Sequence, residues 1–248
     1  MKILVCISSV PDTTSKINFT ENDTKFDTNG VQFVINPYDE FGLTRAMWFK
    51  EKQGATVHVA TVGPASTEPT IRKTLAIGAD EAIRVNAEPT DGLFVAQQLA
   101  EVVKNGAYDL IIAGRESIDY NGGMVPGIMS SILDMNFVNT CIGLEVDGNN
   151  ATAIREIDGG KETVSTSLPL IIGGQKGLVQ ESDLKIPNMR GIMMARQKKL
   201  NVVEPIDAVQ ATIDTKFEKP APKGAVKLID ANNIDELISL LHNEAKVI

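Results

Sequence analysis

The residues best suited to bind a charged ligand lie at 108–131 (YDLIIAGRESIDYNGGMVPGIMSS), where an apolar run meets a glycine-rich turn. Residues 109–113 (DLIIA) have the character of a buried parallel strand. Gly114, Gly122 and Gly123 permit close backbone approach or positive φ. A helix that begins near Gly123 directs free N–H groups and the positive end of its dipole toward the end of that strand. The segment therefore predicts an anion site suited to a nucleotide phosphate.

This turn matches none of the common phosphate-binding motifs, which leaves a second interpretation open. It contains neither GxGxxG nor GxxxxGK[ST]. The HxGH and SGGxDS motifs of nucleotidyl-transfer enzymes with a similar fold are also absent. A strand–glycine–helix turn is often only a tight connection in an α/β protein. Asp12, Asp39 and Asp119 share this ambiguity, since a carboxylate near a strand end commonly caps a helix or shapes a turn.

The sequence lacks the residue sets on which hydrolytic catalysis depends. GxSxG and HExxH are absent, and His58 and His242 are the only histidines. Cys6 and Cys141 each lie in an apolar run, which favours buried free thiols in a reducing compartment over a disulfide. A hydrolase would therefore lack its nucleophile and base, and the spacing predicts no metal site.

Length and charge narrow the classes of protein further. A chain of 248 residues that is 43% hydrophobic can bury one large core, with or without an appendage. The formal net charge of −8 argues against a nucleic-acid partner. The N-terminal MKILVCISSV has the pattern of a first strand rather than a signal peptide, and no apolar run approaches transmembrane length. We therefore expect a cytoplasmic protein without membrane insertion.

The first half of the chain alternates between strands and helices. This rhythm predicts an α/β fold, with a mainly parallel sheet and helices on both faces, of the adenine-nucleotide-binding, Rossmann-like kind. A polar loop separates residues 31–35 from 16–20, and we expect these two segments to pair. The predicted strands are 2–8, 56–62, 81–85 and 109–113, and the predicted helices are 36–52, 68–77 and 91–105.

The second half predicts an antiparallel extension of the sheet, followed by an arm. Short β-rich runs at 141–146, 151–157 and 163–167 are separated by hairpin signals, and 168–173 is a further buried strand. Prolines mark 201–224 as extended, and 233–246 is an amphipathic helix. That helix either folds back or packs on another subunit, and the length of the arm favours the second. The expected domains are therefore 1–200, which binds nucleotide, and 201–248, an arm and helix that pack on a partner.

Methionines and basic residues gather at 186–200 (IPNMRGIMMARQKKL). Methionine adapts to varied contact surfaces, and a basic cluster steers an acidic partner. The simpler interpretation is a helix with a core stripe and a solvated face. The segment alone does not separate these two interpretations.

Several ordered motifs closely resemble the β subunit of electron transfer flavoprotein, nearly from end to end. They are KILVCIS..PD, INPYDEFGL (35–43), VGPAS….IRKTLAIGADEAI (62–83), DLIIAGRESID (109–119), REIDGGKET (155–163) and IPNMRGIMMARQKK. The resemblance implies an electron carrier rather than an enzyme, in a heterodimer with an α subunit that holds most of the redox FAD. It implies transport of electrons from acyl-CoA dehydrogenases of fatty acid β-oxidation, and from related dehydrogenases, to the membrane-bound electron transfer flavoprotein–quinone oxidoreductase.

The resemblance also implies a second nucleotide pocket, which commonly holds a structural AMP. Relatives that bifurcate electrons hold a second FAD in the same pocket, so AMP is the expected ligand and a second FAD is the alternative. For the redox FAD between the subunits, the resemblance implies Thr13 and Tyr38 as contacts on this side. The pocket residues implied by alignment are Cys6, Asn36, Pro37, Tyr38, Asp39, Val62, Gly114, Arg115, Glu116, Ser117, Ile118, Asp119, Tyr120, Asn121, Gly122, Gly123, Met124 and Val125.

Two departures from the family pattern bear on function. Many relatives have Gln-Thr or Gln-Val where this chain has Met124-Val125, which implies phosphate contacts from backbone N–H groups instead. Met189 replaces the leucine anchor of the family's recognition loop for dehydrogenases, and an unbranched side chain of similar volume fits the same pocket. The implied docking residues are Ile186, Pro187, Asn188, Met189, Arg190, Gly191, Ile192 and Met193.

Two other classes of protein stay open on the residues alone. A stand-alone ATP-binding stress-type module is usually shorter and lacks the arm and terminal helix. A nucleotidyl-transfer enzyme needs a phosphate-activating motif that this sequence does not contain.

Overall fold

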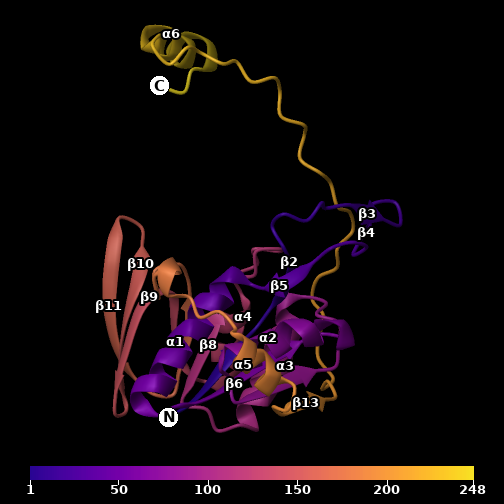
Figure 1. Ribbon diagram of the computed structural model, residues 1–248, viewed down its shortest axis with the longest axis vertical. Coiled ribbons are helices and arrows are strands. Elements are labelled where there is room, and N and C mark those ends of the chain that lie inside the picture. Colours follow the sequence, from indigo (N-terminus) through magenta and orange to yellow (C-terminus); the bar gives the residue numbers. More distant parts are fainter.

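A nine-stranded sheet forms the centre of the computed structural model, which describes residues 1–248 (Figure 1). The strand order is β11-β10-β9-β12-β8-β1-β6-β7-β13. Every neighbouring pair from β9 to β13 in this order is parallel, whereas β10 is antiparallel to both β9 and β11. The predicted α/β fold with an antiparallel extension is therefore confirmed. Its strands are β1 (Lys2–Cys6), β6 (Thr56–Val62), β7 (Glu81–Val85), β8 (Leu110–Gly114), β9 (Asn136–Asp147), β10 (Asn150–Ile157), β11 (Gly160–Ser167), β12 (Leu170–Gly174) and β13 (Leu200–Val203).

Helices cover both faces of the parallel part of the sheet. Side chains of β1 alternate between the faces, so that Ile3 and Val5 pack with one pair of helices and Leu4 and Cys6 with the other. The first pair is α1 (Pro37–Gln53) with α2 (Glu68–Ile77), and the second is α3 (Gly92–Lys104) with α4 (Val125–Leu133).

Local signals set where these helices begin and end. Pro37 is the first residue of α1, where its missing N–H costs nothing, and Gly54 ends the helix in a left-handed conformation with φ of 66°. The Asp91 side chain caps α3 by accepting a hydrogen bond from the Phe94 N–H. Gly42 lets α1 approach the sheet closely, since a Cβ there would lie 2.7 Å from Ile112 Cγ2.

One predicted strand pairing is wrong. Strand β5 (Phe33–Ile35) pairs antiparallel with β2 (Ser9–Pro11), not with residues 16–20. The pairing buries the side chains of Val10 and Ile35, whereas residues 16–20 lie at the surface, with Ile17 exposed. Part of that segment instead forms a small hairpin, β3 (Phe19–Thr20) with β4 (Lys25–Phe26).

Strand boundaries differ from the sequence pattern in two further places. Strand β9 begins at Asn136, earlier than the predicted 141. Strand β13 was not predicted at all; it lies parallel to β7 at the edge of the sheet, with Leu200 packed against the core. Its other apolar side chains, Val202 and Val203, are exposed, so the pattern of a buried strand is missing.

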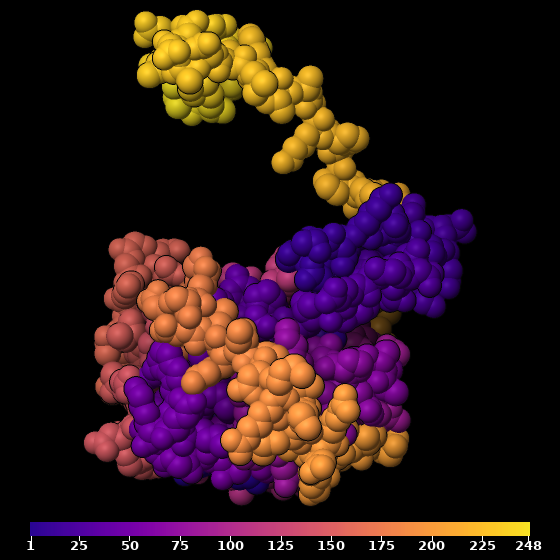
Figure 2. Space-filling view, in the orientation of Figure 1, coloured from indigo at the N-terminus to yellow at the C-terminus, as the bar shows by residue number.

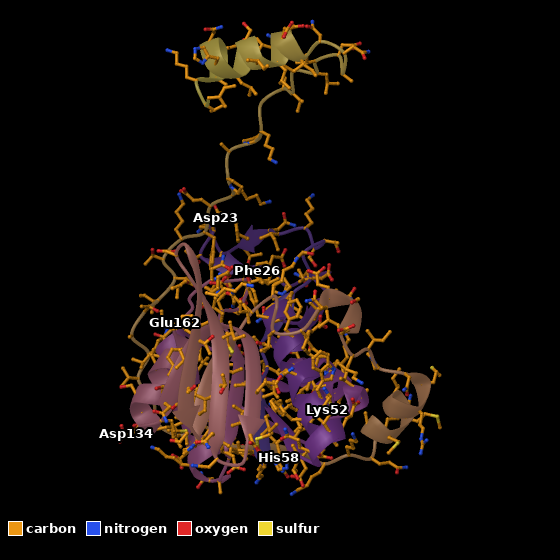
Figure 3. All side chains as sticks on the ribbon, turned by 90° about the vertical axis from the view of Figure 1, so that its left-hand side faces the viewer. Asp23, Phe26, Lys52, His58, Asp134 and Glu162 are labelled. Atoms are coloured by element: carbon orange, nitrogen blue, oxygen red, sulfur yellow. The ribbon has the colours of Figure 1, made fainter.

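The end of the chain stands away from the rest of the molecule (Figures 1 and 2). After β13 the arm passes the β3–β4 hairpin and reaches α6 (Ile234–Ser239), which continues as the π-helical turn η3 (Leu240–Ala245). Figure 3 shows Asp23 and Phe26 of that hairpin at the end of the molecule from which the arm leaves, and His58, at the start of β6, at the opposite end. No helix combines the length and apolar character that crossing a membrane requires.

Candidate functional site

A cavity of about 370 Å³ opens at the carboxyl ends of β1, β6 and β8. The chain order reverses direction between β1 and β8: β1 leads through α1 to β6 on one side, and β8 leads through α4 to β9 and β12 on the other. Open α/β sheets bind ligands at such a switch point. The cavity therefore lies where the fold class places a ligand.

Most of the sequence-predicted pocket residues line this cavity, and five do not. Asn36, Pro37, Tyr38, Ile118 and Asn121 lie outside the lining. The predicted residues that line it are Cys6, Asp39, Val62, Gly114, Arg115, Glu116, Ser117, Asp119, Tyr120, Gly122, Gly123, Met124 and Val125.

The Asp39 carboxylate joins the ends of β1 and β8. Its Oδ2 accepts a hydrogen bond from the Ser8 N–H at 2.7 Å, and its Oδ1 accepts one from the Gly114 N–H at 2.9 Å. Asp39 is buried in the first turn of α1, where the helix dipole favours a negative charge. Burial raises the pKa of Asp39 to about 7, although the hydrogen bonds from Ser8 and Gly114 act in the opposite direction.

Asn36 holds the loop that follows β8. Its side-chain NH₂ donates to the Glu116 carbonyl at 2.9 Å, and its Oδ1 accepts from the Ile118 N–H at 3.2 Å. Asn36 therefore precedes α1 as predicted, but its side chain bonds to the loop and does not cap the helix. It is completely buried, so it supports the cavity wall from behind.

The loop itself reaches α4 through two residues of positive φ. Asn121 has φ of 50° and Gly123 has φ of 60°. A tight turn also contributes, because the Asn121 N–H donates to the Ser117 carbonyl at 2.8 Å. These features aim the first turn of α4 at the cavity, where the N–H groups of Val125 and Gly127 are among those that a helix leaves without intrahelical partners. Pro126 has no N–H, so backbone donors on either side of it must serve an anion.

The charged side chains of the cavity are mostly acidic. Arg115 is the only cation in the lining, and its guanidinium is already engaged by Glu116 at 2.7 Å and by Gln175 at 3.2 Å. Asp119 and Asp214 also line the cavity. An anionic ligand would therefore depend on backbone N–H groups and on the helix dipole rather than on lysine or arginine.

The Cys6 thiol forms part of the apolar wall. Burial raises its pKa well above the ordinary value, with a further contribution from the Asp39 carboxylate. The thiol is therefore unreactive and acts as a small apolar group. Val62 and Ala113 complete this side of the wall, which suits the flat face of a base.

Sequence reasoning missed several residues of the lining. Ser8 and Ser9 come two and three residues after the end of β1, so their position near a strand end was an available signal. Thr212 and Asp214 come from the arm, and no local pattern marks them. The other missed residues are Ile7, Thr67, Pro89, Thr90, Asp91, Gly92, Val95, Leu99, Ala113 and Pro126.

Tyr38 and Thr13, the implied flavin-side contacts, are not part of the cavity. The Arg115 guanidinium lies over the Tyr38 ring, 5.5 Å from its centroid. Thr13 is exposed. Any contact of these two residues with flavin would therefore lie outside the cavity.

The predicted docking segment carries apolar side chains on the surface. Ile186 is 81% exposed, Met189 75% and Met193 67%, which does not fit a helix with a core stripe. Helix α5 (Met189–Ala195) begins at Asn188, whose side chain accepts from the Gly191 N–H at 2.8 Å. Pro187, Arg190 and Ile192 complete the predicted segment.

The body of the protein holds this segment firmly. The Arg72 guanidinium on α2 donates to the carbonyls of Ala195 and Lys198 at 2.9 and 2.8 Å. Ala195 is buried, and Gly191 lies so close to the Ala76 carbonyl that a side chain would not fit. The exposed methionines therefore project from a fixed support.

The chain is similar to known proteins along its whole length. A model of the electron transfer flavoprotein domain matches residues 23–208. The electron transfer flavoprotein subunit beta of Bacillus subtilis (strain 168) is 34% identical over 262 aligned residues, with 100% of each chain covered. The subunit of the same name from Syntrophomonas wolfei is 32% identical, with 100% of this chain and 98% of the relative covered. The Homo sapiens subunit is 31% identical over 84% of this chain and 82% of its own length.

The raised pKa of Asp39 predicts how its substitution changes stability with pH. The folded protein holds the proton at pH values at which the unfolded chain has released it. Asp39 therefore stabilises the fold below its ordinary pKa of 3.8, and this contribution is lost as pH rises through about 7. The free energy of unfolding of the wild type minus that of Asp39→Asn should fall over this range by at most about 1.4 kcal/mol per pH unit.

Urea unfolding at a series of pH values measures this difference. Asp207→Asn, on the exposed arm, serves as the control, since the Asp207 side chain has no hydrogen-bond partner in the structure. A difference between wild type and Asp39→Asn that stays constant from about pH 4 to pH 7 would contradict the raised pKa.

Proposed function

The chain belongs to the electron transfer flavoprotein β-subunit family, and we propose that it forms one half of a heterodimer that carries electrons from acyl-CoA and related dehydrogenases to a membrane quinone reductase. A β subunit implies an α-subunit partner. FAD, when bound, supplies the redox chemistry by accepting and releasing electrons. The α subunit holds most of this FAD, and the β subunit contributes a wall of its site, the docking surface and a nucleotide of its own.

We propose that the nucleotide in the β subunit's cavity is AMP and that its role is structural. The single observation that carries this proposal is the position of the glycine-rich loop and the α4 N-terminus at a cavity of about 370 Å³. A mononucleotide suits that volume and the backbone donors on which an anion must rely. The acidic lining offers no free cation for a triphosphate, which argues against an ATP-binding module.

The base and the phosphate of the proposed AMP would contact different parts of the cavity. The apolar wall around Cys6 and Val62 would take the base, and the turn from Gly122 to Val125 would take the phosphate. None of these groups is a nucleophile or a base in position for bond-making chemistry, because the Cys6 thiol is held protonated by burial. The site therefore supports a bound nucleotide that stays intact.

The docking of dehydrogenases is proposed for α5 and the residues that precede it. Met189 would anchor in an apolar pocket of the dehydrogenase, and the exposed Arg190 and Arg196 of the same segment would contribute positive charge. Residues 201–217 are bonded to the body of this chain, so the part of the predicted 201–248 segment that is proposed to pack on the α subunit is the end of the arm and the terminal helix. Ile234, Leu237 and Ile238 are exposed on α6, which touches little of its own chain (Figure 1).

Asn36→Ala tests the proposed nucleotide site. The substitution leaves the Glu116 carbonyl and the Ile118 N–H without their partner, which costs at most about 1–3 kcal/mol for each of these partly buried groups and loosens the loop. AMP affinity should fall by about tenfold or more. Nucleotides released by heat from the purified heterodimer and separated by chromatography should show less AMP and unchanged FAD.

Asn105→Ala is the matched control, since the Asn105 side chain bonds only to Glu101 in its own helix. Equal AMP content in Asn36→Ala and Asn105→Ala heterodimers would count against the proposed site. Loss of FAD together with AMP would show instead that the variant has failed to assemble.

Met189→Ala tests the proposed docking surface. Truncation of an exposed anchor residue should weaken electron transfer from an acyl-CoA dehydrogenase by about fivefold or more, while flavin content stays at the wild-type level. Ile157→Ala is the control, because Ile157 is also an exposed apolar residue but lies on the β10 end of the sheet. Equal rates of flavin reduction in both variants would remove Met189 from the docking surface.

A further inference from the structure

The arm crosses the mouth of the cavity and is tied to one of its walls. Asp91 Oδ2 accepts hydrogen bonds from the N–H groups of Ala211 at 2.7 Å and Thr212 at 2.8 Å. The other oxygen, Oδ1, caps α3 by accepting from the Phe94 N–H at 2.7 Å. One carboxylate therefore fixes both the helix start and the arm.

A second tie joins the arm to the opposite wall. The Tyr120 hydroxyl, on the glycine-rich loop, donates to Asp214 Oδ2 at 3.1 Å. Partial burial and the Asp214 carboxylate raise the pKa of Tyr120 to about 12, so the hydroxyl keeps its proton at neutral pH. Asp91, Tyr120, Thr212 and Asp214 all line the cavity. The segment 211–214 therefore spans the mouth from α3 to the loop.

Contacts on either side keep this span in place. Before it, the Ile206 N–H and carbonyl both bond to the Gln98 side chain, at 2.9 and 2.8 Å. After it, the Phe217 ring stacks on Phe19, with 5.1 Å between the centroids. The crossing is thus part of the fold rather than a chance position of a loose arm.

We propose that residues 211–214 form a strap that closes the cavity over a mononucleotide, with Tyr120 and Asp214 as residues that determine which nucleotide is retained. This proposal rests on the nucleotide site proposed for the cavity. The Tyr120–Asp214 hydrogen bond slows escape of the ligand, because the mouth opens only when this bond breaks. The strap also limits the length of the ligand, because a dinucleotide would have to extend past residues 211–214.

The charge of the strap adds selectivity against further phosphates. Asp214, Asp119 and Glu116 all line the cavity, and the one cation in the lining, Arg115, is already paired with Glu116. A second phosphate that extends from the Gly122–Val125 turn toward the mouth meets these carboxylates without a compensating cation. AMP is therefore favoured over ADP.

Two variants separate the effect of the Tyr120–Asp214 hydrogen bond from the effect of the Asp214 charge. Tyr120→Phe removes the hydroxyl and keeps the Asp214 charge, whereas Asp214→Asn removes the charge and keeps an oxygen that accepts from Tyr120. Asp207→Asn is the control, a carboxylate on the same arm that is exposed and outside the cavity lining. Each variant is purified as the heterodimer, and its FAD content reports correct assembly.

Dissociation of radiolabelled AMP is followed after a chase with unlabelled AMP, and the Kd values for AMP and ADP are measured on nucleotide-stripped heterodimer. Tyr120→Phe should release AMP about fivefold faster than wild type, in keeping with the loss of one solvent-exposed hydrogen bond of ordinary strength. Asp214→Asn should release AMP near the wild-type rate and lower the preference for AMP over ADP by about threefold or more.

The strap is overturned if Tyr120→Phe releases AMP at the rate of Asp207→Asn, or if Asp214→Asn shows the same preference as that control. Wild-type heterodimer that binds no AMP, or that holds a second FAD in its place, contradicts the nucleotide proposal itself. The two failures are therefore distinguishable, since the first leaves tight AMP binding by the wild type intact.

Discussion

The Asp39 carboxylate is the interaction on which the site depends. It bonds the N–H groups of Ser8 and Gly114, which follow or end the two central strands β1 and β8, from a buried position in the first turn of α1. The two strands pair directly as far as Val5 and Ile112, and beyond this point the chain leaves them in opposite directions. Asp39 joins the two strand ends there, and the neighbouring Asn36 holds the loop after β8.

This arrangement determines which chemical groups face the cavity. With the loop fixed, the turn through Gly123 points backbone N–H groups and the start of α4 inward, while the few charged side chains are acidic or already paired. Such a site favours a compact anion held by the backbone and offers no group for catalysis. The proposed structural nucleotide is consistent with both properties. The redox chemistry would belong to FAD, so the nucleotide of this subunit would only need to stabilise the fold.

Local patterns were enough to predict the alternating strands and helices, and the loop between β8 and α4. They failed where contacts between residues distant in the sequence determine the structure. Residues 33–35 pair with β2 because Val10 must be buried, and β13 has exposed valines that hide its place in the sheet. Thr212 and Asp214 reach the cavity only because a distant tyrosine and aspartate bind the arm, and no spacing in the sequence records such a contact.

The nucleotide content of the purified heterodimer tests the proposed role of the cavity most directly. Heat releases the bound nucleotides, and chromatography with mass spectrometry identifies and counts them. We expect one FAD and one AMP per heterodimer. Two FAD, or FAD with no mononucleotide, would contradict the assignment of the cavity to a structural AMP.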